Sequence, residues 1–575
     1  MAKRIAIIGA GISGLLSCKY VLEKGFTPIV FEADDGVGGV WTRTIETTKL
    51  QTPKQVYQFS DFPWPSSVHE EDSPTGKQVL DYVLSYARCF DLLRYIKFNT
   101  KVIGIEYDGA SDEEMDSWSL WGGTGEPFSP RGKWSISVQN TRSKQVYQAE
   151  FVILCVGRFS GLPKLPDFPI NQGPEVFNGV VVHSMDYSAM EDASAAQLIK
   201  GKRVVVVGNQ KSGLDIAVEC ASANGAEHPC TLIYRTKHWG APNFVVWGVP
   251  LALLYFNRFS ELLLHKPGQG PFLALLAVLL SPLRWFFSKF VESYLKLKYP
   301  LKKYNMIPES SFLEAAFTST FTIMPDNFYD KVEDKSIVLK EAKCFGFCET
   351  GLMIEGDKTP LEADVVILAT GYKGDEKLKN IFSSTTLQKR IIGSPASTVP
   401  LYRECIHPRI PQLAVIGYSE SLANLYTSEM RCRWLARLLE GSFKLPGIRE
   451  MEKDVLKWEK CMKEYSGPYY RKSSIGILHI WYNDQLCKDM GCNPKRKKGF
   501  FAELFEPYGP MDYKDEQYMK NYTAQYYKRT CVAAVHIWYN DQLLREMGFN
   551  PKRKKSFFDE LFQAYGPSDY ANLSS

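Results

Sequence analysis

Several features that would assign the chain to a specialised class are absent from its 575 residues. The 13 cysteines are sparse and form no CxxC pair, and the nearest two, Cys344 and Cys348, are more typical of core thiols than of half a metal site. We therefore expect no metal and a reduced, intracellular compartment. Since 69 basic residues face 64 acidic ones, the net charge of +5 argues against binding nucleic acid through bulk charge.

The chain also lacks an apolar run of the ~20 residues that a membrane-spanning helix needs. A basic start followed by Ile5–Ile8 imitates a signal peptide, but glycines interrupt it and no clean cleavage site follows. Segments 238–257 and 267–283 carry no formal charge with histidine neutral, yet both contain prolines. We interpret residues 238–305 as a buried helical hairpin, with a surface that dips into a bilayer as the alternative. The expected location is the cytoplasm, and the alternative is peripheral attachment to the endoplasmic reticulum membrane.

What is present begins with a glycine-rich turn. The apolar run Arg4–Ile8 predicts a strand buried on both faces, and it leads into a GxGxxG followed by an apolar-periodic helix. A second strand ends at Glu32, whose carboxylate suits a ribose diol. Glycines permit the tight turn and let a pyrophosphate approach the helix N-terminus. The sequence therefore predicts a dinucleotide site at Gly9, Ala10, Gly11, Ile12, Ser13, Gly14 and Glu32.

A second glycine pair, Gly38-Gly39, precedes Val40 and Trp41 shortly after the ribose acid. Such a pair is a feature of FAD-binding folds rather than NAD-binding ones, because it allows another close approach of backbone to cofactor. We therefore expect FAD at the first site, with Gly39, Val40 and Trp41 among its contacts.

The run 203–207 predicts another buried strand entering a glycine turn. Its middle glycine is replaced by Gln210, so the match is weaker. The following strand ends in Arg235 and Thr236, where an NAD site would carry an acid, and a basic residue there suits the 2′-phosphate of NADPH. The expected NADPH contacts are Gly208, Asn209, Gln210, Lys211, Ser212, Gly213, Arg235 and Thr236.

Between the two turns, residues 177–187 have the form FxGxxxHSxxY. This segment resembles the fingerprint of flavin-containing monooxygenases. The segment 59–65 resembles the family's FSDFP element, and 368–372 resembles its ATGY motif. These features span residues 1 to about 440. Together with the segment Lys49–Lys54, they make the chain look most like the plant branch of the family, which includes enzymes that N-hydroxylate a cyclic amino acid.

The resemblance implies an FAD-dependent NADPH monooxygenase of the N,N-dimethylaniline monooxygenase type. In that mechanism NADPH reduces FAD, O2 adds to give a C4a-hydroperoxyflavin, and a soft nucleophile takes the distal oxygen while the protein excludes water. Gln51 stands where many members carry an asparagine, so we expect it to be catalytic. His183 is the other catalytic candidate, although a packing or hinge histidine is at least as good an interpretation. The resemblance adds the cofactor contacts Thr52, Val102, Thr370 and Gly371.

The expected fold is α/β, with two interleaved Rossmann-like dinucleotide-binding domains, a helical hydrophobic insert and a helical C-terminal tail. We expect the FAD domain at residues 1–165 and 336–450. The NADPH domain is expected at 166–335, with the insert at 238–305, and the tail at 451–575.

The tail contains an internal repeat. Residues 462–513 align without gaps on 519–570, with 31 of 52 positions identical, which suggests a tandem duplication. Two copies are too few for a solenoid. Each copy carries an Asn-Pro-Lys-Arg-Lys-Lys run that is best interpreted as a solvated helix end, with nuclear import or anionic lipid as alternatives.

The most favoured reaction is N-hydroxylation of a small amine or amino acid. S-oxygenation, Baeyer–Villiger oxygenation and an uncoupled NADPH oxidase share the same motifs. A disulfide-type reductase is disfavoured because it would need a redox CxxC. The expected partners are a small nucleophilic substrate and O2, with peripheral membrane contact through 238–305 and no nucleic acid.

Overall fold

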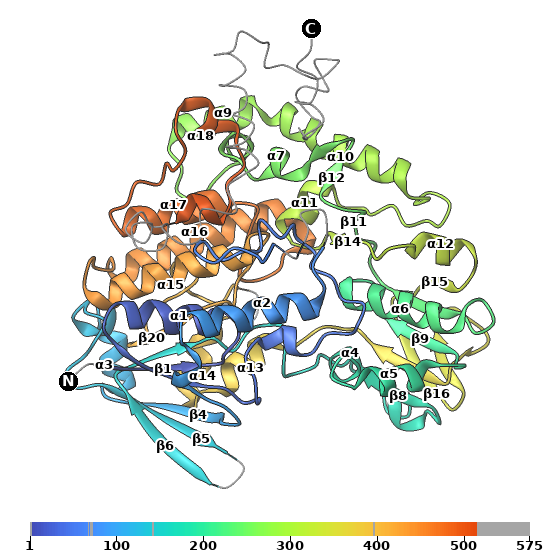
Figure 1. Cartoon of the computed structure of the whole chain (residues 1–575), viewed down its shortest axis with the longest axis horizontal. Helices are drawn as coiled ribbons and strands as arrows, with labels where there is room; N and C mark the ends of the chain where they lie inside the picture. The colour runs from blue at the N-terminus through green and yellow to red at the C-terminus, as the bar shows by residue number, and fades with distance from the viewer. Residues whose placement is uncertain (1–2, 67, 69–72, 141–142, 395–396, 515–575) are drawn as a thin grey trace, which may run out of the picture.

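The structure, a computed structural model, describes residues 3–66, 68, 73–140, 143–394 and 397–514. Two five-stranded parallel sheets form its framework (Figure 1). The first sheet has the order β20 (Leu413–Val415), β7 (Phe151–Leu154), β1 (Arg4–Ile8), β2 (Thr27–Phe31) and β3 (Ile96–Lys97). The second has the order β15 (Ile337–Glu341), β10 (Cys230–Tyr234), β9 (Val204–Val207), β19 (Val365–Leu368) and β8 (Val180–His183).

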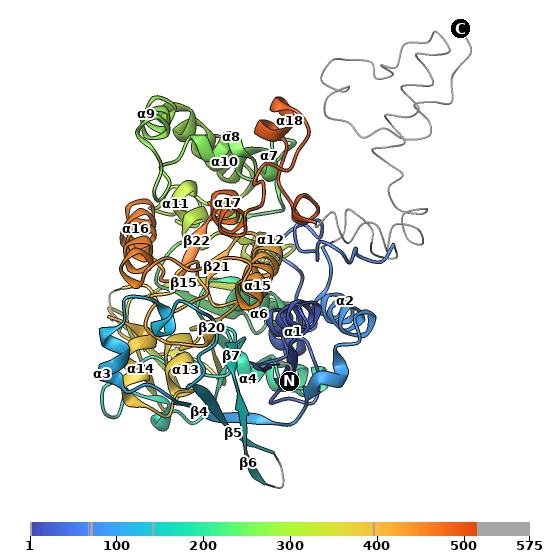
Figure 2. The ribbon, with the colours of Figure 1, turned by 90° about the vertical axis from the view of Figure 1, so that its left-hand side faces the viewer.

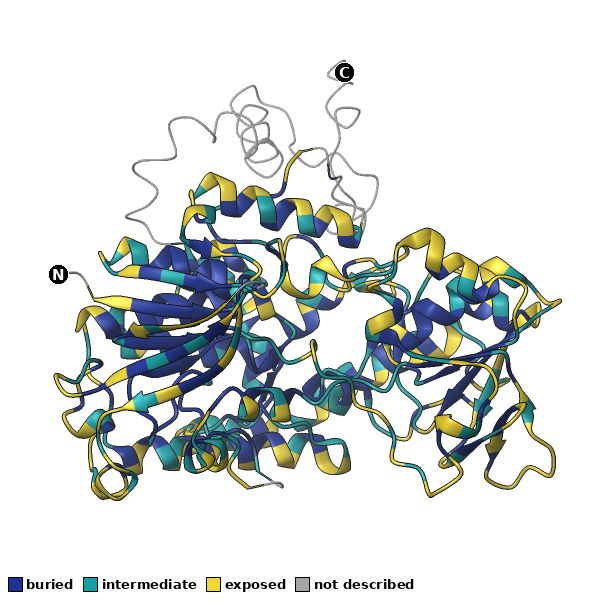
Figure 3. Ribbon diagram, turned by 90° about the horizontal axis from the view of Figure 1, so that it is seen from below, coloured by how far each residue is buried: buried dark blue, intermediate teal, exposed yellow. Residues whose placement is uncertain are grey.

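The apolar strand runs are buried on both faces, as the sequence predicts. In β1, Ile5 and Ile7 face one hydrophobic core while Ala6 and Ile8 face another. In β9, Val204 and Val206 face one hydrophobic core, while Val205 and Val207 face another. Because side chains of a strand alternate between the faces of a sheet, an unbroken apolar run is stable only where both faces are covered. Figure 3 shows the two sheets as separate, mostly buried blocks.

Helices cover one face of each sheet, and small antiparallel sheets lie near the other. In the first domain, α1 (Ile12–Glu23) packs against α15 (Asn424–Glu440). The opposite core includes residues of the three-stranded sheet β4–β6. The remaining elements of these layers are α2 (Gly76–Cys89), β4 (Lys101–Asp108), β5 (Lys133–Gln139), β6 (Lys144–Ala149), α13 (Gly374–Asn380), α14 (Thr385–Ile392), α4 (Ser184–Tyr187), α5 (Asp192–Ile199), α6 (Lys211–Asn224), α12 (Phe328–Glu333), β16 (Phe345–Cys348), β17 (Gly351–Ile354) and β18 (Leu361–Glu362).

The two sheets are interleaved in the chain, but the expected boundary at residue 336 is too early. Strands β15 and β19 both come after it and both belong to the second sheet. The chain returns to the first sheet only at β20. The local pattern of a buried strand is the same in either sheet, so the sequence alone does not tell which sheet such a strand joins.

The insert and the tail form a helical layer at one end of the molecule, which Figures 1 and 2 both show. The helices at that end are α7 (Leu251–Tyr255), α8 (Arg258–Leu262), α9 (Pro271–Leu279), α10 (Ser281–Lys298) and α18 (Phe500–Phe505). Between this end and the sheets lie α11 (Phe312–Phe317), α16 (Ile448–Ser466) and α17 (His479–Asp489). Two-residue strands β21 (Glu420–Ser421) and β11 (Gly240–Ala241) pair in parallel with β22 (Ser474–Gly476) and β14 (Thr322–Ile323).

The expected burial of the hairpin is confirmed only in part: Trp239, Leu254 and Val291 of the insert are buried, but α9 and the start of α10 are exposed. Only Ala277 of α9 is buried, while Phe272 of α9 and Trp285 of α10 are 75% and 63% exposed. Among the described residues, no single helix is long and apolar enough to cross a membrane. The pair α9 and α10 meets that test only when taken together, with a bend of 51° between them. The uncharged, apolar segments of the insert predicted helices. They did not tell whether the apolar face of each helix packs against the protein or is exposed.

The first copy of the tail repeat is docked on the insert. The Arg258 guanidinium donates to both carboxylate oxygens of Asp484, with an Nη2–Oδ1 distance of 2.9 Å, and to the Tyr508 hydroxyl at 3.1 Å. Lys497, from the basic run, pairs with Asp512 at 2.8 Å. The second copy, 519–570, lies outside the described residues.

Candidate active site

The first glycine turn has no space for side chains. A β-carbon on Gly14 would lie 1.9 Å from the carbonyl oxygen of Gly9, and one on Gly9 would lie 2.5 Å from that of Cys155. Gly39, from outside the turn, packs close to Gly11: a β-carbon on Gly39 would lie 3.1 Å from the Cα atom of Gly11. Helix α1 begins directly after Gly11. The turn therefore presents bare backbone and a helix N-terminus, which fits the pyrophosphate of a dinucleotide.

Glu32 lies at the end of β2, beside this turn. Its carboxylate accepts hydrogen bonds from the backbone N–H groups of Ala10 at 2.6 Å and Asp34 at 3.0 Å. Lys377 of α13 is close enough to Glu32 and Asp34 to feel their charges, and it donates to Ser160 at 2.8 Å. Burial lowers the pKa of Lys377 to about 8. This lysine belongs to no sequence motif that we recognised.

The second glycine turn repeats this construction in the other sheet. A β-carbon on Gly213 would lie 1.8 Å from the carbonyl oxygen of Gly208, and one on Gly208 would lie 2.4 Å from that of Ala369. The Asn209 amide donates to the Thr236 carbonyl at 2.9 Å, which joins the turn to the end of β10. Gln210 is the residue before α6. Its replacement of a glycine leaves the tight turn intact.

A cavity of about 510 Å³ is lined by the segment after Gly38-Gly39 and by the second glycine turn. Its volume is in the range of small-molecule sites. The FAD side contributes Val40, Trp41, Arg43, Gln51, Thr52 and Tyr57, and the other side contributes Ser184, Gln210, Lys211, Ser212, Asp215 and Tyr372. Segments after the insert and at the tail add Phe321, Thr322, Glu420, Ser421, Asn424 and Arg471. The cavity therefore joins parts that are hundreds of residues apart in the chain.

Gln51 is held in this cavity by a residue that the sequence did not indicate. The Thr322 hydroxyl donates to Oε1 of Gln51 at 2.8 Å. That bond leaves the Gln51 NH2 group as a donor and fixes which way the amide faces. The Thr52 hydroxyl also lines the cavity, is buried and has no hydrogen-bond partner within the described part of the chain.

His183 lies behind the cavity wall. Its Nδ1 accepts a hydrogen bond from the Met185 backbone at 3.1 Å, which caps the short helix α4. Its ring packs edge-on against Tyr372, with centroids 5.7 Å apart. Burial lowers the pKa of His183, so the neutral imidazole is favoured. The neighbouring Ser184 lines the cavity, whereas His183 is not among the lining residues.

Two charged clusters stand at the cavity wall. Asp215 pairs with Lys211 at 2.7 Å, and burial raises the pKa of Asp215 to about 6. Glu420 is shared by two arginines, with Arg471 Nη2 at 2.9 Å and Arg158 Nη1 at 3.1 Å from the same oxygen. Since two guanidinium groups face one carboxylate, this second cluster has an excess positive charge.

Several predicted cofactor residues lie away from the cavity lining. Val102 is in β4, paired with Val138. Arg235 is exposed at the end of β10. The Thr370 hydroxyl donates to the Lys164 carbonyl at 2.5 Å, and Gly371 has a φ of +87° with open space around it. These positions remain predictions. No group of three or more His, Cys, Asp or Glu side chains suited to a metal occurs among the described residues.

The chain matches a known protein family over most of its length. The family model described as flavin-binding monooxygenase-like matches residues 2–504. A protein of Arabidopsis thaliana named probable flavin-containing monooxygenase 1 is 42% identical over 518 residues, which cover 89% of this chain and 96% of that protein.

Solved structures share the fold at lower identity. An S-allyl-L-cysteine S-oxygenase from Allium sativum is 17% identical, with a TM-score of 0.53 over 95% of this chain and 98% of that one. A structure described as OTEMO in complex with FAD and NADP is 17% identical, with a TM-score of 0.59 over 85% of this chain and 98% of that one.

Proposed function

The chain belongs to the flavin-binding monooxygenase-like family and is an FAD- and NADPH-dependent monooxygenase, and on that premise we propose that it oxygenates a soft nucleophile, by N-hydroxylation of a small amine or amino acid. One atom of O2 enters the product and the other leaves as water, with the electrons supplied by NADPH. The supporting observation is that one cavity is lined both by Val40 and Trp41, which follow the Gly38-Gly39 pair, and by Gln210, Lys211 and Ser212 of the second glycine turn.

We propose the residues that hold the cofactors. The turn from Gly9 to Gly14, with Gly39 and Glu32, would hold FAD, and the turn from Gly208 to Gly213, with Arg235, would hold NADPH. The bound flavin supplies the redox chemistry that joins NADPH oxidation to O2 activation. The protein's own part is to orient both dinucleotides toward one enclosed space and to exclude water from it.

Gln51 is the side chain that we assign to the reacting centre. It lines the cavity, and Thr322 holds its carbonyl oxygen, so the amide N–H groups are available as oriented donors. Fixed donors at a developing charge stabilise it without reorganisation. His183 is assigned a positioning role, because it caps α4 and packs on Tyr372 behind the wall.

An amino acid fits the cavity better than a simple amine because of Arg471. This guanidinium lines the cavity, lies 5.8 Å from the ring centre of Phe159 and shares Glu420 with Arg158. Arg158 is further occupied by the carbonyls of Lys472 and Ser473. In the described part of the chain, Arg471 pairs with Glu420 through Nη2, so its other N–H groups are available to a substrate carboxylate. A guanidinium binds a carboxylate through a charge-assisted pair.

Matched substrates test this proposal. NADPH consumption and product are measured with amino acids, with the amines that lack only the carboxylate, with thioethers and with ketones. We expect the amino acids to give the highest ratio of product to NADPH. Oxygenated thioether or ketone as the main product would replace N-hydroxylation, and NADPH consumption with only hydrogen peroxide formed would indicate an oxidase.

We further propose peripheral attachment to a membrane through the apolar cap, defined as the exposed apolar residues Phe272, Leu275, Val278, Leu279, Trp285, Phe286, Phe500, Phe501 and Phe505. They belong to α9, α10 and α18, which lie at the same end of the molecule (Figure 2). Exposed lysines flank them in α10 and at positions 495 and 498. An apolar surface edged by cations suits an anionic lipid surface, which supports attachment at the cytoplasmic face of such a membrane.

A further inference from the structure

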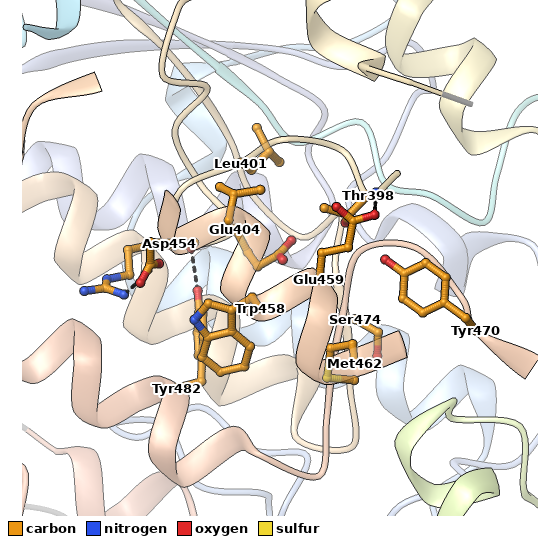
Figure 4. A pocket seen from close by; sticks show the side chains of 12 residues that line it. Thr398, Leu401, Glu404, Asp454, Trp458, Glu459, Met462, Tyr470, Ser474 and Tyr482 are labelled. Carbon is orange, nitrogen blue, oxygen red and sulfur yellow. Dashed lines mark hydrogen bonds and ion pairs between the residues drawn. The ribbon is translucent and has the colours of Figure 1, made fainter. Parts of the chain in front are cut away.

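A short segment of the tail lies between the large cavity and a second, much smaller one. This segment, residues 470–474, is called the strap below, and the small cavity has a volume of about 20 Å³. Arg471 lines the large cavity, whereas Tyr470 and Ser474 line the small one, which Figure 4 shows together with Thr398. Neighbouring side chains of the strap therefore face two different cavities, and Arg471 is the one that faces the proposed site of reaction.

The strap turns sharply at Ser473. This residue has a φ of +51°, in the left-handed region that residues with a β-carbon rarely adopt. Ser473 is also buried, with 1% of its surface exposed. A strained backbone of this kind persists only where the surrounding structure holds it from several directions.

Thr398 holds the turn from the side of the small cavity. Its hydroxyl oxygen accepts from the Ser473 N–H at 2.9 Å and lies 3.3 Å from the Ser473 hydroxyl. The Thr398 N–H donates to Glu459 of α16 at 3.2 Å, and Thr398 is itself buried. Because Thr398 is anchored through its own backbone, its hydroxyl is a fixed partner for the strained residue.

Arg158 and Glu420 hold the same turn through its carbonyl groups. Nη1 of Arg158 donates to the Lys472 carbonyl at 2.7 Å, and the Glu420 N–H donates to the Ser473 carbonyl at 2.9 Å. The Glu420 carboxylate then accepts from Arg158 at 3.1 Å and pairs with Arg471 Nη2 at 2.9 Å. Glu420 thus fixes both the backbone of the turn and the guanidinium of the residue two positions before it.

We propose that the strap is the element of the large cavity that selects a carboxylate-bearing substrate, and that Thr398 is a positioning residue that holds the turn at Ser473 and so aims the Arg471 guanidinium. This inference rests on the proposed carboxylate-bearing substrate. An arginine side chain has several rotatable bonds, so ordering it during binding costs conformational entropy. A strap that fixes the backbone of Arg471 in advance reduces that cost, and preorganised groups bind a ligand more tightly.

The experiment measures binding of acetate, as the carboxylate probe, to the full-length, FAD-loaded enzyme by NMR titration. Thr398→Val replaces the hydroxyl by a methyl group of similar size. We expect the dissociation constant of acetate to rise roughly 5-fold or more, the usual lower limit of coupling between sites. FAD content and the KM for NADPH should not change, whereas a general loss of structure would alter them. Thr398→Ser keeps the hydroxyl and should bind acetate like the wild type.

Two substitutions of Ser473 test the strained turn itself. Glycine adopts a positive φ freely and keeps the N–H that Thr398 accepts, so Ser473→Gly should bind acetate like the wild type. Ser473→Val should weaken acetate binding as Thr398→Val does, because a β-branched residue is strongly disfavoured at positive φ. If Thr398→Val fails to retain FAD, this pair decides the question, and equal acetate binding in the two Ser473 variants would overturn the proposal.

Arg471→Met separates this inference from the proposed function. Acetate binding should fall in Arg471→Met, and adding Thr398→Val should weaken it no further, because two residues that act through one group are not additive. Unchanged acetate binding in Arg471→Met would contradict the proposed substrate anchor. If Arg471→Met weakens acetate binding but Thr398→Val does not, or if the two losses add, only the positioning role of Thr398 is refuted.

Discussion

Gly11 and Gly39 bring two separate loops into backbone contact, since a β-carbon on Gly39 would lie 3.1 Å from the Cα atom of Gly11. The Gly38 N–H also donates to the Ala10 carbonyl at 3.2 Å. The pair Gly38-Gly39, which follows Glu32, thus packs directly against the turn Gly9–Gly14, although about 25 residues of chain separate the pair from the turn. This contact, with the positive φ of Gly39, explains why the second loop needs glycine at this position.

Gly39→Ala should therefore weaken FAD binding. Gly39 has a φ of +61°, where alanine costs about 1–2 kcal/mol, and the new methyl group would press on Gly11. We expect FAD affinity to fall roughly 10-fold, since about 1.4 kcal/mol is a factor of ten. The measurement is the ratio of flavin to protein absorbance during dialysis. Gly25→Ala is the matched control, because Gly25 has a φ of +77° with nothing within 4 Å. Equal flavin loss in both variants would contradict a specific role of the contact.

Sequence reasoning predicted the parts of the fold that depend on local pattern. The two glycine turns are formed by adjacent residues under strict steric limits, so Gly9, Gly14, Gly208 and Gly213 lie where their spacing indicates. The assignment of β15 and β19 to the second sheet was not predictable, because it depends on which distant strand each one pairs with.

The same distinction applies to the cavity. Gln51 was predicted from a motif, whereas Thr322 approaches it across 271 residues and belongs to none. Arg158 follows Gly157, and a glycine at the end of a strand is a pattern that the sequence shows. The pairing of Arg158 with Glu420 is not such a pattern, because the two residues are 262 positions apart. Such long-range pairs leave no periodic trace in one sequence.

Gln51→Ala should raise the share of NADPH electrons lost as hydrogen peroxide, because the cavity loses its oriented amide donor. Thr322→Val should do the same to a smaller extent, since it frees the Gln51 amide without removing it. Peroxide and product are quantified per NADPH consumed. We expect a several-fold rise for Gln51→Ala. An unchanged ratio of product to NADPH would show that Gln51 has no part in coupling.

Arg235→Ala should reduce the preference for NADPH over NADH. A charge-assisted contact to the 2′-phosphate contributes about 1.5–3 kcal/mol, so kcat/KM for NADPH should fall roughly 10-fold or more while that for NADH changes little. The control is Arg203→Ala, in the same domain, because Arg203 pairs with Asp364 at 2.8 Å. A parallel loss for both cofactors in Arg235→Ala would refute 2′-phosphate recognition.

His407 should make the protein sensitive to acid. Its Nδ1 accepts from the Arg409 backbone at 3.1 Å and its Nε2 lies 3.0 Å from the Arg390 carbonyl, so the buried ring is satisfied only when neutral. Burial lowers the pKa of His407 to about 3. The unfolded chain takes up a proton below about pH 6.5, and the folded one does not. Stability is therefore complete above pH 6.5 and falls by about 1.4 kcal/mol per pH unit below it for this residue.

Urea unfolding at pH 7.5, 6 and 5 measures this dependence. His407→Gln should be less stable at pH 7.5, because it loses a fitted buried ring, but its stability should fall less steeply with acid. A variant with the same slope as the wild type would assign the acid sensitivity to other groups, such as His238, whose pKa burial and Arg471 lower to about 4.

The apolar cap should control binding to anionic lipid vesicles. Phe272 and Phe286 are 75% and 53% exposed on α9 and α10, and burying one such side chain contributes about 1.5–3 kcal/mol. The double variant Phe272→Ser/Phe286→Ser should therefore reduce vesicle partitioning roughly 100-fold or more in a flotation assay, with FAD content and NADPH oxidation unchanged. Ile170→Ser is the control, since Ile170 is 90% exposed and lies outside the apolar cap. If neutral vesicles bind as well as anionic ones, the flanking lysines have no role. If the double variant floats like the wild type, α9 and α10 are not the contact, and their exposed apolar side chains need another explanation.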